Sequence, residues 1–397
     1  MDSKIYTTVL LLTYFQVADL TVSTVQKDIY NAIMTGYTKE VHPYTTAGTP
    51  LHIYAQAFLL SINDFDEVSG ILEIVIILGL QWEDEALAWD LVNHSYKGVI
   101  VIPQKQIWTP ELYNVKAADT FEAIGGGNFK VTVIYSGEVH MYPGGILKVK
   151  CSPDVAKFPF DVQTCSLELL PWMYTFTDTV ITASVSQLDM TYYEMNGEWT
   201  VLETSISSGI KGDYSVIVIT IKMERLPLYH LVNTVVPLYF LGFLNPLVFI
   251  LPCDCGERSG YTLTMLLSYT VFMMVINSAL PQTSSPMAVL SFVTFGALVF
   301  SGFIAVINCF QLRMFHRDES VPVPAWLVKL VKMLSCSRRG RVKPDEDINV
   351  QNEETSSPSS TVTWKKVVDV LDMVYLTAIY VTGIVGTIVG LLYLTSG

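Results

Sequence analysis

The hydrophobic positions of this chain change their pattern near residue 227. Beyond that point, four mostly apolar stretches of about 20 residues or more are each long enough to cross the ~30 Å hydrocarbon core of a bilayer. Pro237 and Pro246 in the first stretch are tolerated where neighbouring helices satisfy the backbone. We therefore predict four transmembrane helices. The stretches are Leu231–Leu251, Tyr261–Leu280, Ala288–Leu312 and Leu371–Leu394.

Before that point the pattern is typical of β-strands. Ile71–Leu78 is a β-branched run, and Tyr214–Met223 alternates branched residues. Lys130–Tyr135 and Glu138–Tyr142 predict two strands joined by a tight turn at Ser136-Gly137. No segment of useful length with a helical period competes between Thr24 and Pro227. We therefore predict an all-β sandwich of about 200 residues, immunoglobulin-like with about ten strands, in an α+β multidomain membrane protein.

Charge orients the predicted helices. Arg258 lies between the first two stretches, Arg313 and Arg317 follow the third, and the loop 281–286 carries no charge. The positive-inside rule therefore places both termini outside. The N-terminus has Lys4 and then the apolar run Val9–Phe15, which is typical of a signal peptide, with an amphipathic helix as the alternative. The expected parts are a signal peptide (1–23), an extracellular sandwich (24–227) and helices one to three (228–317), the second of which spans 258–280. A cytoplasmic linker (318–364) ending in a disordered acidic stretch and a fourth helix with an extracellular end (365–397) follow.

Composition excludes several classes of function. The mean hydropathy of +0.41 indicates a membrane protein, and the net charge of −13 argues against nucleic-acid binding. The histidines of the predicted outer part show no metal-ligand spacing with cysteines or with one another. No catalytic constellation is present, so we expect neither an enzyme nor a cofactor. Asn93 begins the one glycosylation sequon of the outer part.

Two cysteines carry the most informative motif. Cys151 and Cys165 enclose thirteen residues with Phe158-Pro159-Phe160-Asp161 at their centre, ahead of the four apolar stretches. This arrangement resembles the Cys-loop pentameric ligand-gated ion channels. The resemblance implies a disulfide between the two cysteines, worth roughly 3 kcal/mol on a chain-entropy estimate. It also implies a homo- or hetero-pentamer in the plasma membrane, expected at synapses.

The second apolar stretch is the candidate pore helix. One helical face carries small or hydroxylated residues toward its inner end and apolar residues in its middle, and Leu267 is the expected centre of a gating ring. A plain packing helix is the alternative. Gly256-Glu257-Arg258 resembles the step before the pore in cation-selective members, so a ring of Glu257 would select monovalent cations. A neutralised Glu257–Arg258 pair is the alternative. The pore face is Gly260, Thr264, Leu267, Val271, Met274 and Ser278.

Further motifs resemble serotonin type-3 receptors, above all Pro322-Val323-Pro324-Ala325-Trp326-Leu327. This resemblance implies an aromatic box between subunits that holds an amine-like agonist, with Trp172 and Tyr214 on one face and Tyr142 on the other. Two positions depart from the pattern. Ile77 replaces a box tryptophan. Val115-Lys116 replaces an acidic and amide pair, and Lys116 would repel an ammonium group. Trp82 and Trp89 are expected in the core.

The resemblance also implies a coupling region at the membrane boundary, made by Phe160, Asp161, Arg225 and the loop around Pro281. An Asp161–Arg225 charge pair there would have two arrangements. We expect a subunit of an amine-gated cation channel. An accessory subunit, a channel gated by zinc or protons, an anion channel and a non-conducting binding protein are the alternatives.

Overall fold

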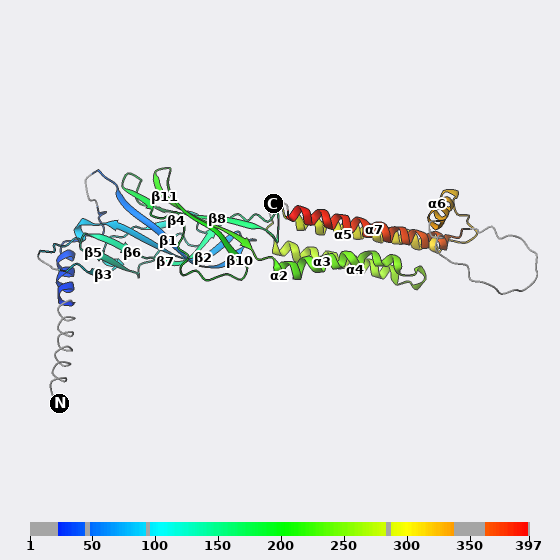
Figure 1. Cartoon of the computed structure of the whole chain (residues 1–397), viewed down its shortest axis with the longest axis horizontal. Coiled ribbons are helices and arrows are strands. Elements are labelled where there is room, and N and C mark those ends of the chain that lie inside the picture. Colours follow the sequence, from blue (N-terminus) through cyan, green and yellow to red (C-terminus); the bar gives the residue numbers. More distant parts are fainter. Residues whose placement is uncertain (1–22, 44–47, 93–95, 283–286, 337–361, 396–397) are drawn as a thin grey trace, which may run out of the picture. The chain divides into compact units, whose positions relative to one another are not determined.

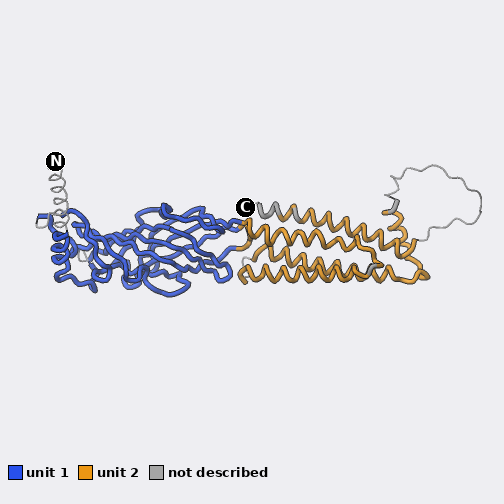
Figure 2. The backbone as a smooth tube through the Cα atoms, turned by 90° about the horizontal axis from the view of Figure 1, so that it is seen from below, with its two compact units in different colours: residues 1–154, 161–226 blue, residues 155–160, 227–397 orange. Residues whose placement is uncertain are grey.

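The computed structural model of the chain describes residues 23–43, 48–92, 96–282, 287–336 and 362–395. It divides into two compact units, which Figure 2 shows in different colours. Unit 1 comprises residues 1–154 and 161–226 and contains the strands. Unit 2 comprises residues 155–160 and 227–397 and contains the long helices (Figure 1). The predicted signal peptide, except its last residue, and Asn93 lie outside the described residues.

The described chain begins with a helix at residues 23–34. The prediction of β structure from Thr24 onward is therefore wrong for this segment. Ile29 and Ile33 are buried in the core of the sandwich, and Val25 packs against it. These three residues are four positions apart, which is the spacing of one helical face.

The larger sheet of unit 1 has seven strands and contains the predicted hairpin in its interior. Gly137, in the turn between β5 (Lys130–Ile134) and β6 (Glu138–Met141), has φ of 86°, a conformation that glycine adopts without strain. The predicted pairing of these two strands is confirmed. In spatial order the strands are β3 (Val99–Pro103), β5 (Lys130–Ile134), β6 (Glu138–Met141), β2 (Ile71–Glu83), β1 (Leu51–Asp66) and β9 (Thr179–Ala183), with β7 (Gly144–Lys150) also paired to β2.

The smaller sheet has four strands, so the described residues contain eleven strands where about ten were expected. The Cys151–Cys165 disulfide is confirmed, with Cα atoms 5.3 Å apart. It joins the end of β7 in the larger sheet to β8 in the smaller one. In spatial order the strands are β10 (Trp199–Lys211), β11 (Tyr214–Arg225), β8 (Val162–Pro171) and β4 (Leu112–Asn114).

The core of unit 1 lies between the two sheets. Alternate residues of β1, such as Ile53, Ala55 and Leu59, are buried, as period-two strands require. Trp82 and Trp89 are also buried, which confirms their predicted place in the core. This shared core explains why residues from eleven strands fold as one unit.

Unit 2 contains four helices that are long and apolar enough to cross a membrane. The first is irregular because each of its prolines lacks a backbone donor. A widened turn at Leu231–Val235 precedes Pro237, and tight turns at Asn245–Ile250 contain Pro246. The four spans are α2 (Leu228–His230) with α3 (Val236–Leu244) and the tight turns up to Ile250, α4 (Glu257–Ala279), α5 (Val289–Phe315) and α7 (Trp364–Thr395).

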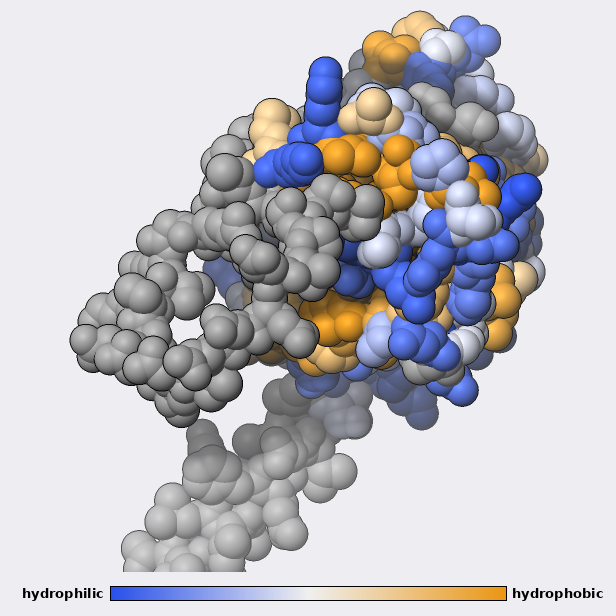
Figure 3. Space-filling view, turned by 90° about the vertical axis from the view of Figure 1, so that its right-hand side faces the viewer, coloured by the Kyte–Doolittle hydropathy of each residue, from blue (hydrophilic) through white to orange (hydrophobic). Residues whose placement is uncertain are grey.

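The linker after α5 contains a short amphipathic helix, α6 (Ala325–Cys336). Leu327 and Val331 on this helix pack against Trp364 and Val367 of α7. This packing explains why α7 begins earlier than the predicted span. On the face shown in Figure 3, groups of hydrophobic residues lie beside hydrophilic ones among the described residues. The acidic, Ser-rich part of the linker, residues 337–361, lies outside the described residues.

Candidate functional site

Trp172 and Tyr214, the two predicted residues of one box face, lie together. Trp172 directly follows β8, and Tyr214 begins β11, which pairs with β8. Their rings are nearly parallel, with an interplanar angle of 6° and centroids 5.8 Å apart. Trp172 remains 47% exposed. The exposed ring of Trp172 beside Tyr214 is suited to hold a cation.

The structure adds two aromatic residues that the sequence analysis did not single out. The Phe121 ring stacks on Tyr113 of β4, with centroids 5.1 Å apart, and contacts Trp172 edge to face at 5.5 Å. Tyr113, Phe121, Trp172 and Tyr214 thus form a continuous row, named here the aromatic row. In the sequence, Tyr113 could have been noticed because it closely follows the motif Trp108-Thr109-Pro110-Glu111. Its position near Trp172, however, follows only from the pairing of β4 with β8.

Tyr142, the predicted residue of the opposite face, is not part of the aromatic row. It lies just beyond β6 in the larger sheet, where its ring is 6.5 Å from that of Phe58 on β1. Ile77 on β2 pairs with Phe58 across the two strands. Among the described residues, Tyr142 makes no ring contact with Trp172 or Tyr214. The two predicted faces therefore belong to different sheets, and a single chain does not bring them together.

Lys116 is held by its own subunit. Its Nζ lies 3.1 Å from Glu168 Oε1 and donates a hydrogen bond of 2.6 Å to Ser166. Lys211 at the end of β10 donates to the other oxygen of Glu168. The hydrogen bond from Lys211 lowers the pKa of Glu168, against the opposing effect of partial burial, and Lys116 adds to the lowering. A shared carboxylate therefore partly neutralises the charge expected to repel an ammonium ligand.

The turn between β10 and β11 is also fixed near the aromatic row. The Phe176 N–H donates a hydrogen bond of 2.8 Å to the carbonyl of Asp213, in the two-residue turn that follows Lys211. Together with the Lys211–Glu168 link and the Trp172–Tyr214 stack, this bond attaches the tip of the hairpin to the segment after β8. The β10–β11 hairpin beside the aromatic row is therefore fixed to β8 and the segment after it by three contacts.

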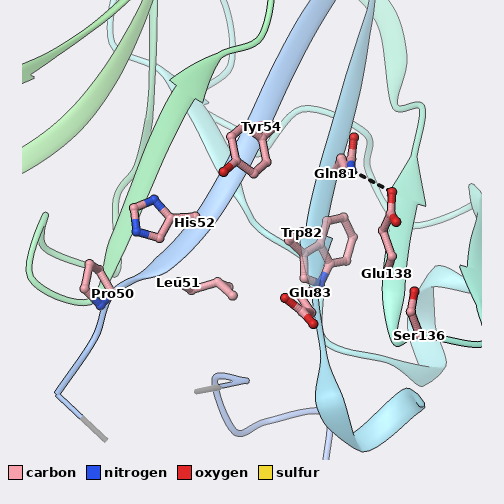
Figure 4. Close-up of a pocket in the computed structure, with 9 residues that line it drawn as sticks. All are labelled: Pro50, Leu51, His52, Tyr54, Gln81, Trp82, Glu83, Ser136 and Glu138. Atoms are coloured by element: carbon pink, nitrogen blue, oxygen red, sulfur yellow. Dashed lines mark hydrogen bonds between the residues drawn. The ribbon is translucent and has the colours of Figure 1, made fainter. Parts of the chain in front are cut away.

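A separate cavity of about 430 Å³ lies in the larger sheet (Figure 4). Tyr54 from β1, Gln81 and Glu83 from β2 and Glu138 from β6 line it, and Gln81 donates a hydrogen bond of 2.6 Å to Glu138. It contains no residue of the aromatic row and none of the predicted site residues. The cavity is therefore distinct from the predicted agonist site.

The predicted Asp161–Arg225 pair is present and has a third member. Both residues are buried, and the Arg225 Nε and Nη2 atoms lie 2.8 Å and 3.1 Å from the two carboxylate oxygens of Asp161. Nη2 also contacts Glu67, which the sequence analysis missed. The guanidinium lies 4.3 Å from the centroid of the Trp199 ring. One arginine thus joins the end of β11 to the Cys-loop and to the loop after β1.

The tip of the Cys-loop belongs to unit 2. Val155 and Phe158 are buried among α4 and α5 residues such as Ile276 and Leu290. The N–H of Val289 donates a hydrogen bond of 3.1 Å to the carbonyl of Ala156. Val155 also lines a cavity that includes Pro281. The loop tip therefore contacts the connection between α4 and α5, where coupling is predicted, and Phe160 remains 40% exposed.

All six residues of the predicted pore face are exposed on α4. The opposite face of α4, with Thr262, Met265, Tyr269 and Ile276, is buried in unit 2. Leu267, the expected centre of the ring, is 64% exposed. A helix that buries one face and leaves a matching stripe free within its subunit is suited to line a shared pore.

Arg258 does not pair with Glu257, which removes one alternative. Arg258 is fully buried, and both of its terminal nitrogens contact the carboxylate of Asp372 on α7. Gln311 on α5 accepts a further hydrogen bond of 3.2 Å. Glu257 itself is exposed at the start of α4. The negative charge of Glu257 is therefore not neutralised by its neighbour in sequence.

Comparison with known proteins identifies the family. Residues 26–227 match the family model of the neurotransmitter-gated ion-channel ligand binding domain, and residues 234–347 match that of the transmembrane region. The chain therefore belongs to the neurotransmitter-gated ion-channel family, whose members are ligand-gated channels and not enzymes.

Similar proteins include neuronal acetylcholine receptor subunits. The alpha-6 subunit of Rattus norvegicus is 28% identical over 76% of this chain and 62% of its own length. The alpha-6 subunit of Gallus gallus is 29% identical over 87% and 72%, and the alpha-3 subunit of Bos taurus is 29% identical over 75% and 62%. The match thus spans about three-fifths of the rat and bovine relatives. These relatives are acetylcholine rather than serotonin receptor subunits.

Proposed function

We propose that this chain is a subunit of a pentameric, cation-selective channel of the plasma membrane that opens when a small amine binds between subunits. The observation that carries the cation selectivity is the pairing of Arg258 with Asp372, which leaves Glu257 exposed and not paired with Arg258. Five such carboxylates at a narrow inner mouth would concentrate cations and repel anions.

An amine agonist is supported by the aromatic row. Aromatic faces attract an ammonium group by roughly 2 kcal/mol or more when the site is desolvated. The curated relatives are acetylcholine receptor subunits, and the motifs around Pro322–Leu327 resemble serotonin receptors. Acetylcholine and serotonin both carry a cationic nitrogen, so either resemblance favours a small organic cation. The aromatic row would form one face of the site and Tyr142 with Phe58 the other.

Voltage-clamp recording tests the selectivity. The chain is expressed alone and with acetylcholine receptor subunits, and is challenged with a panel of amines in asymmetric NaCl. We expect agonist-evoked current that reverses near the sodium potential. Glu257→Gln should shift reversal toward the chloride potential, whereas Asp254→Asn, at an exposed acid three positions earlier, should leave it unchanged. Reversal of the wild-type current at the chloride potential would contradict cation selectivity.

A second candidate is an accessory subunit that contributes only the Trp172–Tyr214 face. Ile77 favours it, because an aliphatic side chain beside Phe58 replaces an aromatic wall on the opposite face. This candidate predicts current only on co-expression, and loss of that current in Trp172→Ala but not in Tyr142→Ala. Agonist-evoked current from the chain alone would exclude it.

A further inference from the structure

Phe121 occupies an unusual position in the aromatic row. Its ring is 51% exposed, yet it contacts Tyr113 on one side and Trp172 on the other. It is the member of the row that stands between β4 and the segment after β8. A large, half-exposed apolar side chain in contact with two aromatic rings is not part of the buried core.

The backbone around Phe121 is fixed. The segment after β4 folds back, so that Tyr113 pairs with Ala123 and the Ile124 N–H donates a hydrogen bond of 2.9 Å to the carbonyl of Leu112. On the other side, the Ala118 N–H donates a hydrogen bond of 2.9 Å to the carbonyl of Lys148. The backbone is therefore held on both sides of Phe121, and the ring is presented to Trp172 by a constrained loop.

A cation held by this row needs the space that Phe121 fills. An ammonium group binds over a ring face, within about 6 Å of the centroid. Tyr214 already lies parallel to Trp172, and Phe121 closes the approach from the side of Tyr113. A primary ammonium carries one substituent and has a compact head. A quaternary ammonium has methyl groups on every side and needs more room.

We infer that Phe121 determines which amines this site accepts, by narrowing the aromatic row so that compact primary ammonium groups are favoured over quaternary ones. This inference rests on the proposed amine-binding function. Replacing the Phe121 ring with a small side chain should open a gap between Tyr113 and Trp172 with an aromatic face on either side. A quaternary head would then contact both rings.

The test measures the binding of two probes to the purified full-length channel in lipid nanodiscs. The probes are methylammonium and tetramethylammonium, and Kd is obtained from tryptophan fluorescence or calorimetry. In Phe121→Ala, we expect the Kd of tetramethylammonium to fall at least about tenfold relative to that of methylammonium. Phe121→Leu keeps most of the bulk and should change the ratio by less than about threefold. Met173→Ala, at an exposed residue next to Trp172, is the matched control and should leave the ratio unchanged.

Each outcome decides the inference. An unchanged ratio in Phe121→Ala, with methylammonium still bound, would overturn it and leave the proposed function intact, provided that Trp172→Ala abolishes binding. Failure of the wild-type channel to bind either probe would overturn both. If Phe121→Ala does not fold, Phe121→Val is measured in its place. The inference would then be overturned if the ratio of the two Kd values were the same in Phe121→Val as in Phe121→Leu.

Discussion

The two units each bury one arginine beside acidic residues, but the two arginines are satisfied differently. In unit 1, Arg225 contacts two carboxylates, Asp161 and Glu67, and lies over the Trp199 ring. In unit 2, Arg258 contacts one carboxylate, that of Asp372, and is otherwise surrounded by neutral groups. Arg225 thus contacts two carboxylates for its single positive charge, whereas Arg258 contacts one.

Other buried polar atoms around Arg258 lack hydrogen-bond partners, so the stability of this cluster depends strongly on the Arg258–Asp372 pair. Within the described part of the chain, the Arg258 Nε, the Gln311 Nε2 and both side-chain amide atoms of Asn308 are buried without a hydrogen-bond partner. An ionisable group inside a membrane bundle is costly unless it is paired. The comparison indicates that the Arg258 cluster holds α7 against α4 and α5, whereas the Arg225 cluster has a spare carboxylate and is suited to change partners.

Asp372→Asn should have the largest effect. Removing one partner of a buried ion pair costs about 3–5 kcal/mol, because the remaining charge is left without compensation. We expect most of the channel to be lost from the cell surface, as measured by surface labelling and by the yield of pentamers.

The matched control for this substitution is Asp369→Asn. Asp369 lies one helical turn before Asp372 on α7 but is exposed. The substitution Asp369→Asn should leave surface expression near the wild-type level. Equal surface expression of the two variants would contradict the role assigned to the Arg258–Asp372 pair.

Arg225→Gln should have a smaller effect on folding and a large one on gating. Unit 1 has an extensive core that tolerates the loss of one pair, so the variant should reach the surface. It should lose agonist-evoked current by more than about tenfold, since the link from β11 to the Cys-loop is broken. Lys222→Gln, at an exposed position on β11, is the control. Normal currents from Arg225→Gln would remove the coupling role.

Glu67→Gln should have the smallest effect of the three substitutions. We expect a small change in the stability of the channel, and the size of this change depends on pH. Burial raises the pKa of Glu67, although Arg225 acts to lower it. Because the folded pKa lies above the unfolded value of about 4.3, the protonated form is favoured by folding. Wild-type stability relative to Glu67→Gln should therefore rise as the pH falls from 7, and the gain is complete below the unfolded pKa.

This expectation is measured as the thermal unfolding midpoint of the purified channel between pH 7 and pH 4. At pH 7 the midpoint of Glu67→Gln should equal or exceed that of the wild type, by up to about 4 °C. Glu224→Gln, at an exposed residue beside Arg225, should show no such trend. A Glu67→Gln midpoint well below the wild type at pH 7 would show that Arg225 requires both carboxylates.

Local patterns predicted the four spans, several of the strands and the family. Long apolar stretches predict spans, because a bilayer demands length and composition. A β-branched run predicted β2, a tight turn between two short strands predicted β5 and β6, alternation predicted β11, and the disulfide followed from the family motif. The helix at residues 23–34 was missed because its apolar face is short and lies close to the end of a predicted signal peptide. The position of α6 in the linker was likewise not predicted.

The sequence by itself predicted the four spans, the sandwich and a candidate pore stripe on α4, because these patterns involve residues close together in sequence, and the family motif implied the disulfide. The structure decided that the stripe is exposed. Only the tertiary structure decided which charges pair and which rings meet. Arg258 and Asp372 are 114 positions apart, and Phe121 reaches Trp172 only through the pairing of β4 with β8. Such contacts follow from how helices and strands pack, and packing is set by the whole core rather than by any local pattern.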